Sequence, residues 1–210
     1  MHHAMEELLN VIAGVDEEEY LLVKIAEAAW VGASLELKVE ISVEDRAERG
    51  AWSIRCEYLL AHTLSGQSGS SLELVDDHPL LWEFKYPNAS AFFDGVPSNS
   101  EACIGALYKA HEGATSSWLR LGAYLNNSGH LSELLSAGNG LLARGPVPLL
   151  QIYKDALQPH GVDVSIVGEH HPKFFDGMTR RSTDGEDIKA LLLGASYVVG
   201  IGWTAERTRD

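Results

Sequence analysis

The chain has 210 residues, of which 45% are hydrophobic and 22% charged, a composition that excludes a disordered or low-complexity protein. Thirty acidic against sixteen basic side chains leave a net charge of -14, which repels the phosphates of nucleic acids and the surfaces of anionic membranes. We therefore expect no nucleic-acid partner, and the excess acid is available for a basic protein partner, a metal ion or solubility alone.

The two cysteines, Cys56 and Cys103, fall on different predicted elements and indicate no disulfide framework, which is typical of a reducing compartment. No basic region followed by an apolar stretch opens the chain, so we expect a cytoplasmic location. The first residues, MHHAM, resemble a cloning remnant in part, and His2 and His3 are left out of any site. The longest apolar run, 190–203, is too short for a bilayer and is interrupted by glycines, so membrane insertion is not expected.

An N-terminal pair of helices is predicted first. Apolar residues recur at helical spacing from Met5 to Ile12, and Gly14 can end that helix. Asp16, with Glu19 three residues later, resembles the cap of a second helix, whose apolar face would run from Leu22 to Trp30.

A meander of antiparallel strands follows. Apolar and polar residues alternate without exception from Leu35 to Glu44, which predicts a strand with one buried face. A second alternating run, from Trp52 to Tyr58, predicts its hairpin partner. Shorter runs predict strands at 72–75, 80–86 and 89–93.

The rest of the chain mixes helices and strands. Helices are predicted at 98–111, around 131–135 and at 146–158, and strands at 162–167 and 190–203. The predicted fold class is α+β: an antiparallel meander sheet with an N-terminal helical pair, packed helices and further C-terminal strands. We expect a single domain over 1–210; a break near 126–129 would give lobes of 5–126 and 130–205.

The sequence KFFDG at 173–177 is almost a copy of AFFDG at 91–95. Either the chain contains a duplicated unit, or it uses one kind of turn twice. A helical pattern follows the first copy, whereas a polar loop follows the second. Because Asp-Gly is a common turn pair, the sequence favours reuse of a turn over duplication.

The stretch GEHHPKFFDG offers His170, His171 and Asp176, together with Glu169, as ligands for a divalent metal such as zinc or iron. Adjacent histidines on a strand point to opposite faces, so a shared ion requires the segment to be a loop, which Gly168 and Pro172 favour. The spacing matches no specific zinc signature, and solvated loop histidines are the favoured interpretation.

A second candidate lies in GNGLLARGP, where Gly138, Gly140 and Arg144 precede a predicted helix and would form an anion site. A glycine-rich motif that binds a dinucleotide would have to follow a strand, whereas a leucine-rich helical segment precedes GNGLLARGP. A loop built for tight turns is therefore favoured over a phosphate site.

Two functions from different classes follow. The leading hypothesis is an intracellular accessory protein without a catalytic site, which acts by protein–protein contact or by self-association as a homo-oligomer. The alternative is a metal-dependent hydrolase or metal-binding enzyme that uses His170, His171 and Asp176. Binding of a small ligand between the sheet and the 146–158 helix is a third possibility with no specific residue in its favour.

Overall fold

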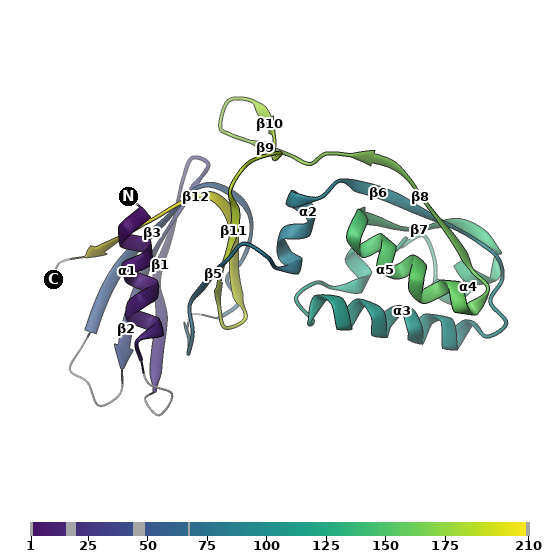
Figure 1. The fold of residues 1–210 in the computed structure, drawn as a ribbon, viewed down its shortest axis with the longest axis horizontal. Helices are drawn as coiled ribbons and strands as arrows, with labels where there is room; N and C mark the ends of the chain where they lie inside the picture. Colours follow the sequence, from purple (N-terminus) through teal and green to yellow (C-terminus); the bar gives the residue numbers. More distant parts are fainter. Residues whose placement is uncertain (1, 16–19, 44–48, 67, 209–210) are drawn as a thin grey trace. The chain divides into compact units, whose positions relative to one another are not determined.

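A computed structural model describes residues 2–15, 20–43, 49–66 and 68–208 (Figure 1). The chain forms two compact units. The first comprises the chain up to Leu81, Lys173–Arg181 and the chain from Gly185 on; the second comprises Trp82–Pro172 and Ser182–Asp184. Each unit has its own cluster of buried apolar residues, and the break expected near 126–129 lies inside the second unit.

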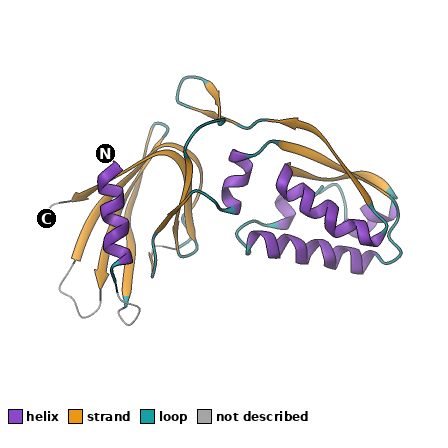
Figure 2. Ribbon diagram, in the orientation of Figure 1, coloured by secondary structure: helices purple, strands orange, loops and turns teal. Residues whose placement is uncertain are grey.

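The first unit is built on an antiparallel sheet of seven strands in the order β4-β1-β2-β3-β12-β11-β5 (Figure 2). These strands are β1 (Leu21–Val31), β2 (Ser34–Val43), β3 (Arg49–Thr63), β4 (Ser68–Gly69), β5 (Glu73–Val75), β11 (Ile188–Leu193) and β12 (Ser196–Thr208). Although β4 and β5 follow each other closely in sequence, they pair with opposite edges of the sheet, β1 and β11. The segment that contains them therefore bridges the two edges of a strongly curved sheet.

The alternating sequences form strands as predicted. Leu37, Val39 and Ile41 of β2 are buried, whereas Lys38 and Glu40 between them are exposed. Burial of every second residue places one face of the sheet in the core, where each fully buried aliphatic side chain contributes about 1.5–3 kcal/mol. The α+β class is therefore correct in broad terms, with antiparallel sheet predominating.

The N-terminal helical pair is wrong, because only its first member is a helix. Helix α1 (His2–Ala13) buries Met5 and Leu8 in the core of the first unit and packs against β12. The residues expected in the second helix form β1, which pairs with β2 along its length. Leu21 and Val23 are buried with one residue between them, so tertiary pairing with β2 decides the structure over a helical spacing. The expected cap at 16–19 lies outside the described residues.

We expect the stability of the first unit to fall at alkaline pH because of the buried thiol of Cys56. A Cβ at Gly200 would lie 2.1 Å from the Cys56 sulfur, so only glycine leaves room for the thiol. Burial raises the pKa of that thiol from 9.0 to about 12. Above pH 9 the unfolded chain therefore loses a proton that the folded chain keeps, and stability falls as the pH rises towards 12, by up to about 1.4 kcal/mol per pH unit. Urea unfolding across this range should show a shallower decline for Cys56→Ala than for the unsubstituted protein; equal slopes would show that the thiol does not contribute.

The second unit contains a three-stranded antiparallel sheet in the order β7-β6-β8, covered on one face by helices (Figure 1). Its elements are α2 (Trp82–Lys85), β6 (Asn88–Asp94), α3 (Ser100–Thr115), η2 (Leu121–Ala123), α4 (Leu131–Ser136), β7 (Asn139–Pro146), α5 (Val147–Leu157), η3 (Gln158–His160) and β8 (Asp163–His170). Helix α5 packs on all three strands, and α3 packs against α5. Asn99 caps α3 by accepting the N–H of Ala102 at 2.9 Å, so the helix begins two residues after the start predicted at residue 98.

Two other sequence predictions need correction. The strand expected at 80–86 is instead a 3-10 turn, η1 (Pro79–Leu81), followed by α2. His78 starts it, because its carbonyl accepts the N–H of Leu81 at 2.9 Å. The loop expected at 138–146 contains β7, which pairs with β6 from Asn139 to Pro146. In both segments a short apolar run is compatible with more than one structure until its neighbours are known.

The two FFDG copies occupy different settings. The first ends β6, the central strand of its sheet, and the second ends β9 (Lys173–Phe175), which forms a two-stranded sheet with β10 (Arg180–Ser182). Gly95 and Gly177 both have a positive φ, 115° and 97°. The shared feature is thus a turn that needs glycine, which supports reuse of a turn over duplication.

In the described part of the chain, no helix is long and apolar enough to cross a membrane.

Candidate functional site

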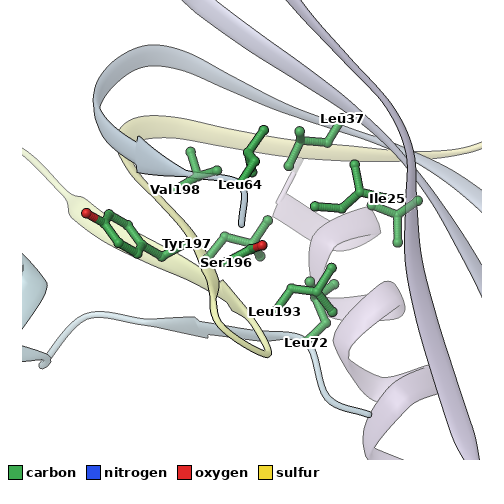
Figure 3. A pocket seen from close by; sticks show the side chains of 10 residues that line it. Ile25, Leu37, Leu64, Leu72, Leu193, Ser196, Tyr197 and Val198 are labelled. Carbon is green, nitrogen blue, oxygen red and sulfur yellow. The ribbon is translucent and has the colours of Figure 1, made fainter. Parts of the chain in front are cut away.

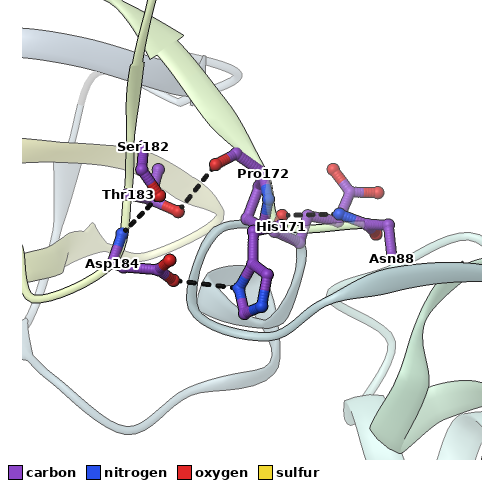
Figure 4. Close-up of polar contacts among 7 residues, drawn as sticks. Asn88, His171, Pro172, Ser182, Thr183 and Asp184 are labelled. Atoms are coloured by element: carbon purple, nitrogen blue, oxygen red, sulfur yellow. Dashed lines mark hydrogen bonds and ion pairs between the residues drawn. The ribbon is translucent and has the colours of Figure 1, made fainter. Parts of the chain in front are cut away.

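The three predicted metal ligands have separate local partners. His170 is the last residue of β8 and pairs with Asn88, so the expected loop is a strand up to this point. The next residue, His171, places Nδ1 3.0 Å from Asp184 Oδ1, and both side chains are more than half exposed (Figure 4). Asp176 belongs to the first unit, whereas the two histidines belong to the second. Over the described ranges, no three His, Cys, Asp or Glu side chains are grouped so that they could hold a metal ion.

The carboxylate of Asp176 is engaged by its own turn. Its Oδ1 accepts the N–H of Thr179 at 2.7 Å and that of Met178 at 2.8 Å. These two N–H groups hold the pKa of the Asp176 carboxyl below its usual value. The residue thus performs the turn role that Asp commonly has before glycine.

The segment around His171 is fixed by backbone contacts. The Thr183 hydroxyl and N–H each donate to the carbonyl of Pro172, both at 3.2 Å, and the Asp184 N–H donates to the hydroxyl of Ser182 (Figure 4). Thr183 is buried, so its hydroxyl needs such an acceptor. These hydrogen bonds hold the segment around His171 in place, which is a structural role.

Of the predicted anion residues, Gly140 and Arg144 are on β7 and Gly138 immediately precedes it, and the three do not converge. Gly138 and Arg144 are six residues apart on extended chain, which separates them by roughly 20 Å at about 3.3 Å per residue. The Gly138 carbonyl accepts the N–H of Gly95 at 2.7 Å, and the Arg144 N–H donates to the carbonyl of Tyr124. Gly140 approaches the ring of Phe93, with a Cβ position 3.5 Å from that ring. The glycines therefore serve packing and pairing within the sheet.

Helices α3 and α5 enclose a polar cluster at their contact. His111 and Tyr153 are fully buried, and His111 Nδ1 lies 2.8 Å from the Tyr153 hydroxyl. His111 Nε2 lies 2.7 Å from the carbonyl of Leu119; because a carbonyl can only accept, Nε2 carries the hydrogen and Nδ1 accepts from Tyr153. Burial raises the pKa of Tyr153, so its hydroxyl stays protonated and remains a donor. The cluster is a closed hydrogen-bond network that joins the two helices.

The core of the first unit contains a small apolar cavity, lined in part by Ile25, Leu37 and Val198 (Figure 3). Its volume is about 10 Å³, the size of one water molecule at most. The hydroxyl of Ser196, one of its lining residues, already donates to the Gly66 carbonyl at 2.6 Å. The cavity is a packing defect and is too small for a ligand.

A larger concave site lies on the first unit, and we call it the acidic groove. Its volume is 590 Å³, within the range of ligand pockets. Apolar side chains from α1, β5 and β12 form part of its wall: Met5, Leu9, Leu74, Ile201 and Trp203. Its charged residues are Glu6, Glu57, Asp76, Glu186, Asp187 and Lys189. The lining therefore combines five carboxylates and one ammonium group with an apolar surface.

Two of these carboxylates are already paired. Asp187 lies 3.0 Å from Lys189, and Glu186 lies 3.2 Å from Arg181. Glu6 and Glu57 have no basic partner among the described residues. Carboxylates without a counter-ion in a concave surface produce a negative potential that attracts cations.

Glycine 202 positions the carboxylate of Glu57. The two residues lie opposite each other on β12 and β3, between the pairs Trp203–Cys56 and Ile201–Tyr58. A Cβ at Gly202 would lie 2.7 Å from Glu57 Oε2, so the carboxylate lies over the bare backbone of β12. Gly202 also has φ 73°, a conformation that favours glycine.

Sequence reasoning did not find the acidic groove. Its carboxylates come from α1, β3, the end of β5 and the start of β11, so no local motif joins them. The overall charge and the alternation that places Glu57 on the outer face of β3 were the available signals. No protein-family model, curated protein or solved structure matches the chain.

Proposed function

We propose that this protein is a non-catalytic binding protein that takes up a positively charged segment of a partner protein in the acidic groove. The proposal rests on one observation: a 590 Å³ groove that combines an apolar wall with five carboxylates, of which Glu6 and Glu57 have no basic partner among the described residues. Lysine and arginine side chains combine a cationic head with an apolar stem, so they match both parts of this surface.

The charge of the whole chain favours the same kind of partner. A net charge of -14 speeds the approach of a basic protein and repels nucleic acid. It also repels a second copy of the chain, so a different, basic protein is favoured over self-association. The metal-dependent hydrolase has less support, because Asp176 is engaged by its turn and His171 by Asp184.

The proposal is tested with two double variants of equal net charge. Glu6→Lys with Glu57→Lys reverses two carboxylates in the groove, whereas Glu7→Lys with Glu40→Lys reverses two exposed carboxylates outside it, on the same helix and the neighbouring strand. We expect the octapeptide (Lys-Val)4 to bind the groove variant roughly tenfold more weakly, and the control variant less than about twofold more weakly. Fluorescence anisotropy of the labelled peptide at low and high salt measures both.

Equal weakening in the two variants would show that the net charge, and not the groove, attracts the peptide. Binding of (Glu-Val)4 as strong as that of (Lys-Val)4 would contradict the proposal altogether.

A further inference from the structure

Strand β12 extends beyond β11, its neighbour on one side of the sheet. It pairs with β3 from Tyr197 to Thr208, but with β11 only from Ser196 to Ile201. From Gly202 to Thr208 its other edge has no strand partner within the described part of the chain. Such an edge presents a row of N–H and C=O groups that can pair with another extended chain.

The unpaired edge begins inside the acidic groove. Gly202, Trp203 and Thr204 line the groove. The chain that would otherwise continue β11 along this edge turns away just before it, where the Ile188 N–H donates to the carbonyl of Glu186 at 3.0 Å. The space in line with β11 is therefore part of the groove, with α1 on one side and the end of β5 near by.

The side chains around this space alternate in character. Glu57 lies opposite Gly202, so its carboxylate is in the row of Gly202. Residues in one row share a face of the sheet. Trp203, the next residue of β12, is buried on the opposite face, with Met5 of α1 in the same apolar cluster.

We propose that the basic partner segment binds as an added β-strand on the edge Gly202–Thr208, continuing the line of β11. This inference rests on the proposed function and specifies the partner's conformation: an extended chain of alternating basic and apolar residues. Basic side chains would face the row of Glu57, and apolar ones would face Trp203 and Met5. Main-chain pairing supplies affinity in this mode, and alternate side chains supply specificity.

The experiment compares (Lys-Val)4 with two N-methylated forms, one methylated at every lysine nitrogen of the main chain and one at every valine nitrogen. Successive N–H groups of a strand point to opposite edges, so one of the two sets removes the donors that face β12. We expect one methylated form to bind the full-length protein at least tenfold more weakly than (Lys-Val)4, and the other less than about threefold more weakly.

Amide hydrogen exchange locates the added strand. Binding of (Lys-Val)4 should slow the exchange of alternate amides between Gly202 and Thr208, and leave the exchange of β8, whose outer edge is also unpaired in the described structure, unchanged. Tight binding that neither methylation weakens, or that leaves the 202–208 amides unprotected, would overturn strand addition while the groove proposal stands. Absence of any (Lys-Val)4 binding would overturn both.

Discussion

Replacement of Gly95 by alanine is expected to destabilise the second unit by roughly 3–5 kcal/mol, whereas the same change at Gly177 costs about 1–2 kcal/mol. Both glycines follow an Asp in an FFDG turn and both have a positive φ, so each alanine pays the strain of that conformation. Only at Gly95 is there a second effect: a Cβ would lie 2.5 Å from the carbonyl oxygen of Gly161. Around Gly177, apart from its two chain neighbours, no atom of the described residues lies within 4 Å of the Cβ position.

The two units need separate readouts, because each can unfold on its own transition. Hydrogen exchange of the α3 and α5 amides reports the second unit, and that of the β2 and β3 amides reports the first. A third variant, Gly105→Ala in α3, is the positive control: its Cβ meets no atom and its φ is not positive, so we expect about 0.5–1 kcal/mol of stabilisation. Similar losses for Gly95→Ala and Gly177→Ala would show that the backbone of Gly161 moves aside.

The second large effect concerns the His111–Tyr153 pair. His111→Leu should destabilise the second unit by about 3–4 kcal/mol, because it leaves the Leu119 carbonyl and the Tyr153 hydroxyl buried without their partner. Tyr153→Phe alone should cost about 1–3 kcal/mol, since it leaves one nitrogen of His111 unpaired. The double variant should lose no more than His111→Leu, because the hydroxyl that lost its partner is then absent.

Urea unfolding of the four proteins gives this comparison as a double-mutant cycle. Tyr108→Phe is the matched control: Tyr108 is on the same helix as His111 and its side chain is exposed, so we expect a change within about 0.5 kcal/mol. Strictly additive losses would mean that the histidine and the tyrosine stabilise the helices independently.

The sequence predicted those parts of the fold in which one local pattern decides the structure. Strict alternation identified β2 and much of β3, and apolar spacing identified α1, α3 and α5. It failed for β1, whose small residues, such as Ala26 and Ala29, are compatible with helical spacing, while its pairing with β2 fixes it as a strand. It failed for 80–86 because Leu80 and Leu81 are both buried, which no strand with one wet face allows.

The candidate site could not be predicted from the sequence, for a different reason. Two adjacent histidines are easily recognised in a sequence, so His170 and His171 suggested a metal site. In the structure each has a separate local contact. The carboxylates of the acidic groove come from four segments that are far apart in the sequence. The pairing of β12 with β3 and β11, the pairing of β5 with β11 and the packing of α1 on β12 bring them near one another. Long-range strand pairing of this kind has no signature in a single sequence.

The insertion of the second unit within the first has a consequence for translation. Strands β1, β2 and β3 are made before the second unit, but β12, which pairs with β3 along most of its length, is made only after it. The whole second unit emerges in between and can fold first, because domains generally form as they are completed. Until β12 is made, the nascent chain carries a long strand, β3, with one edge open and its buried face uncovered. A chaperone would be needed during this interval.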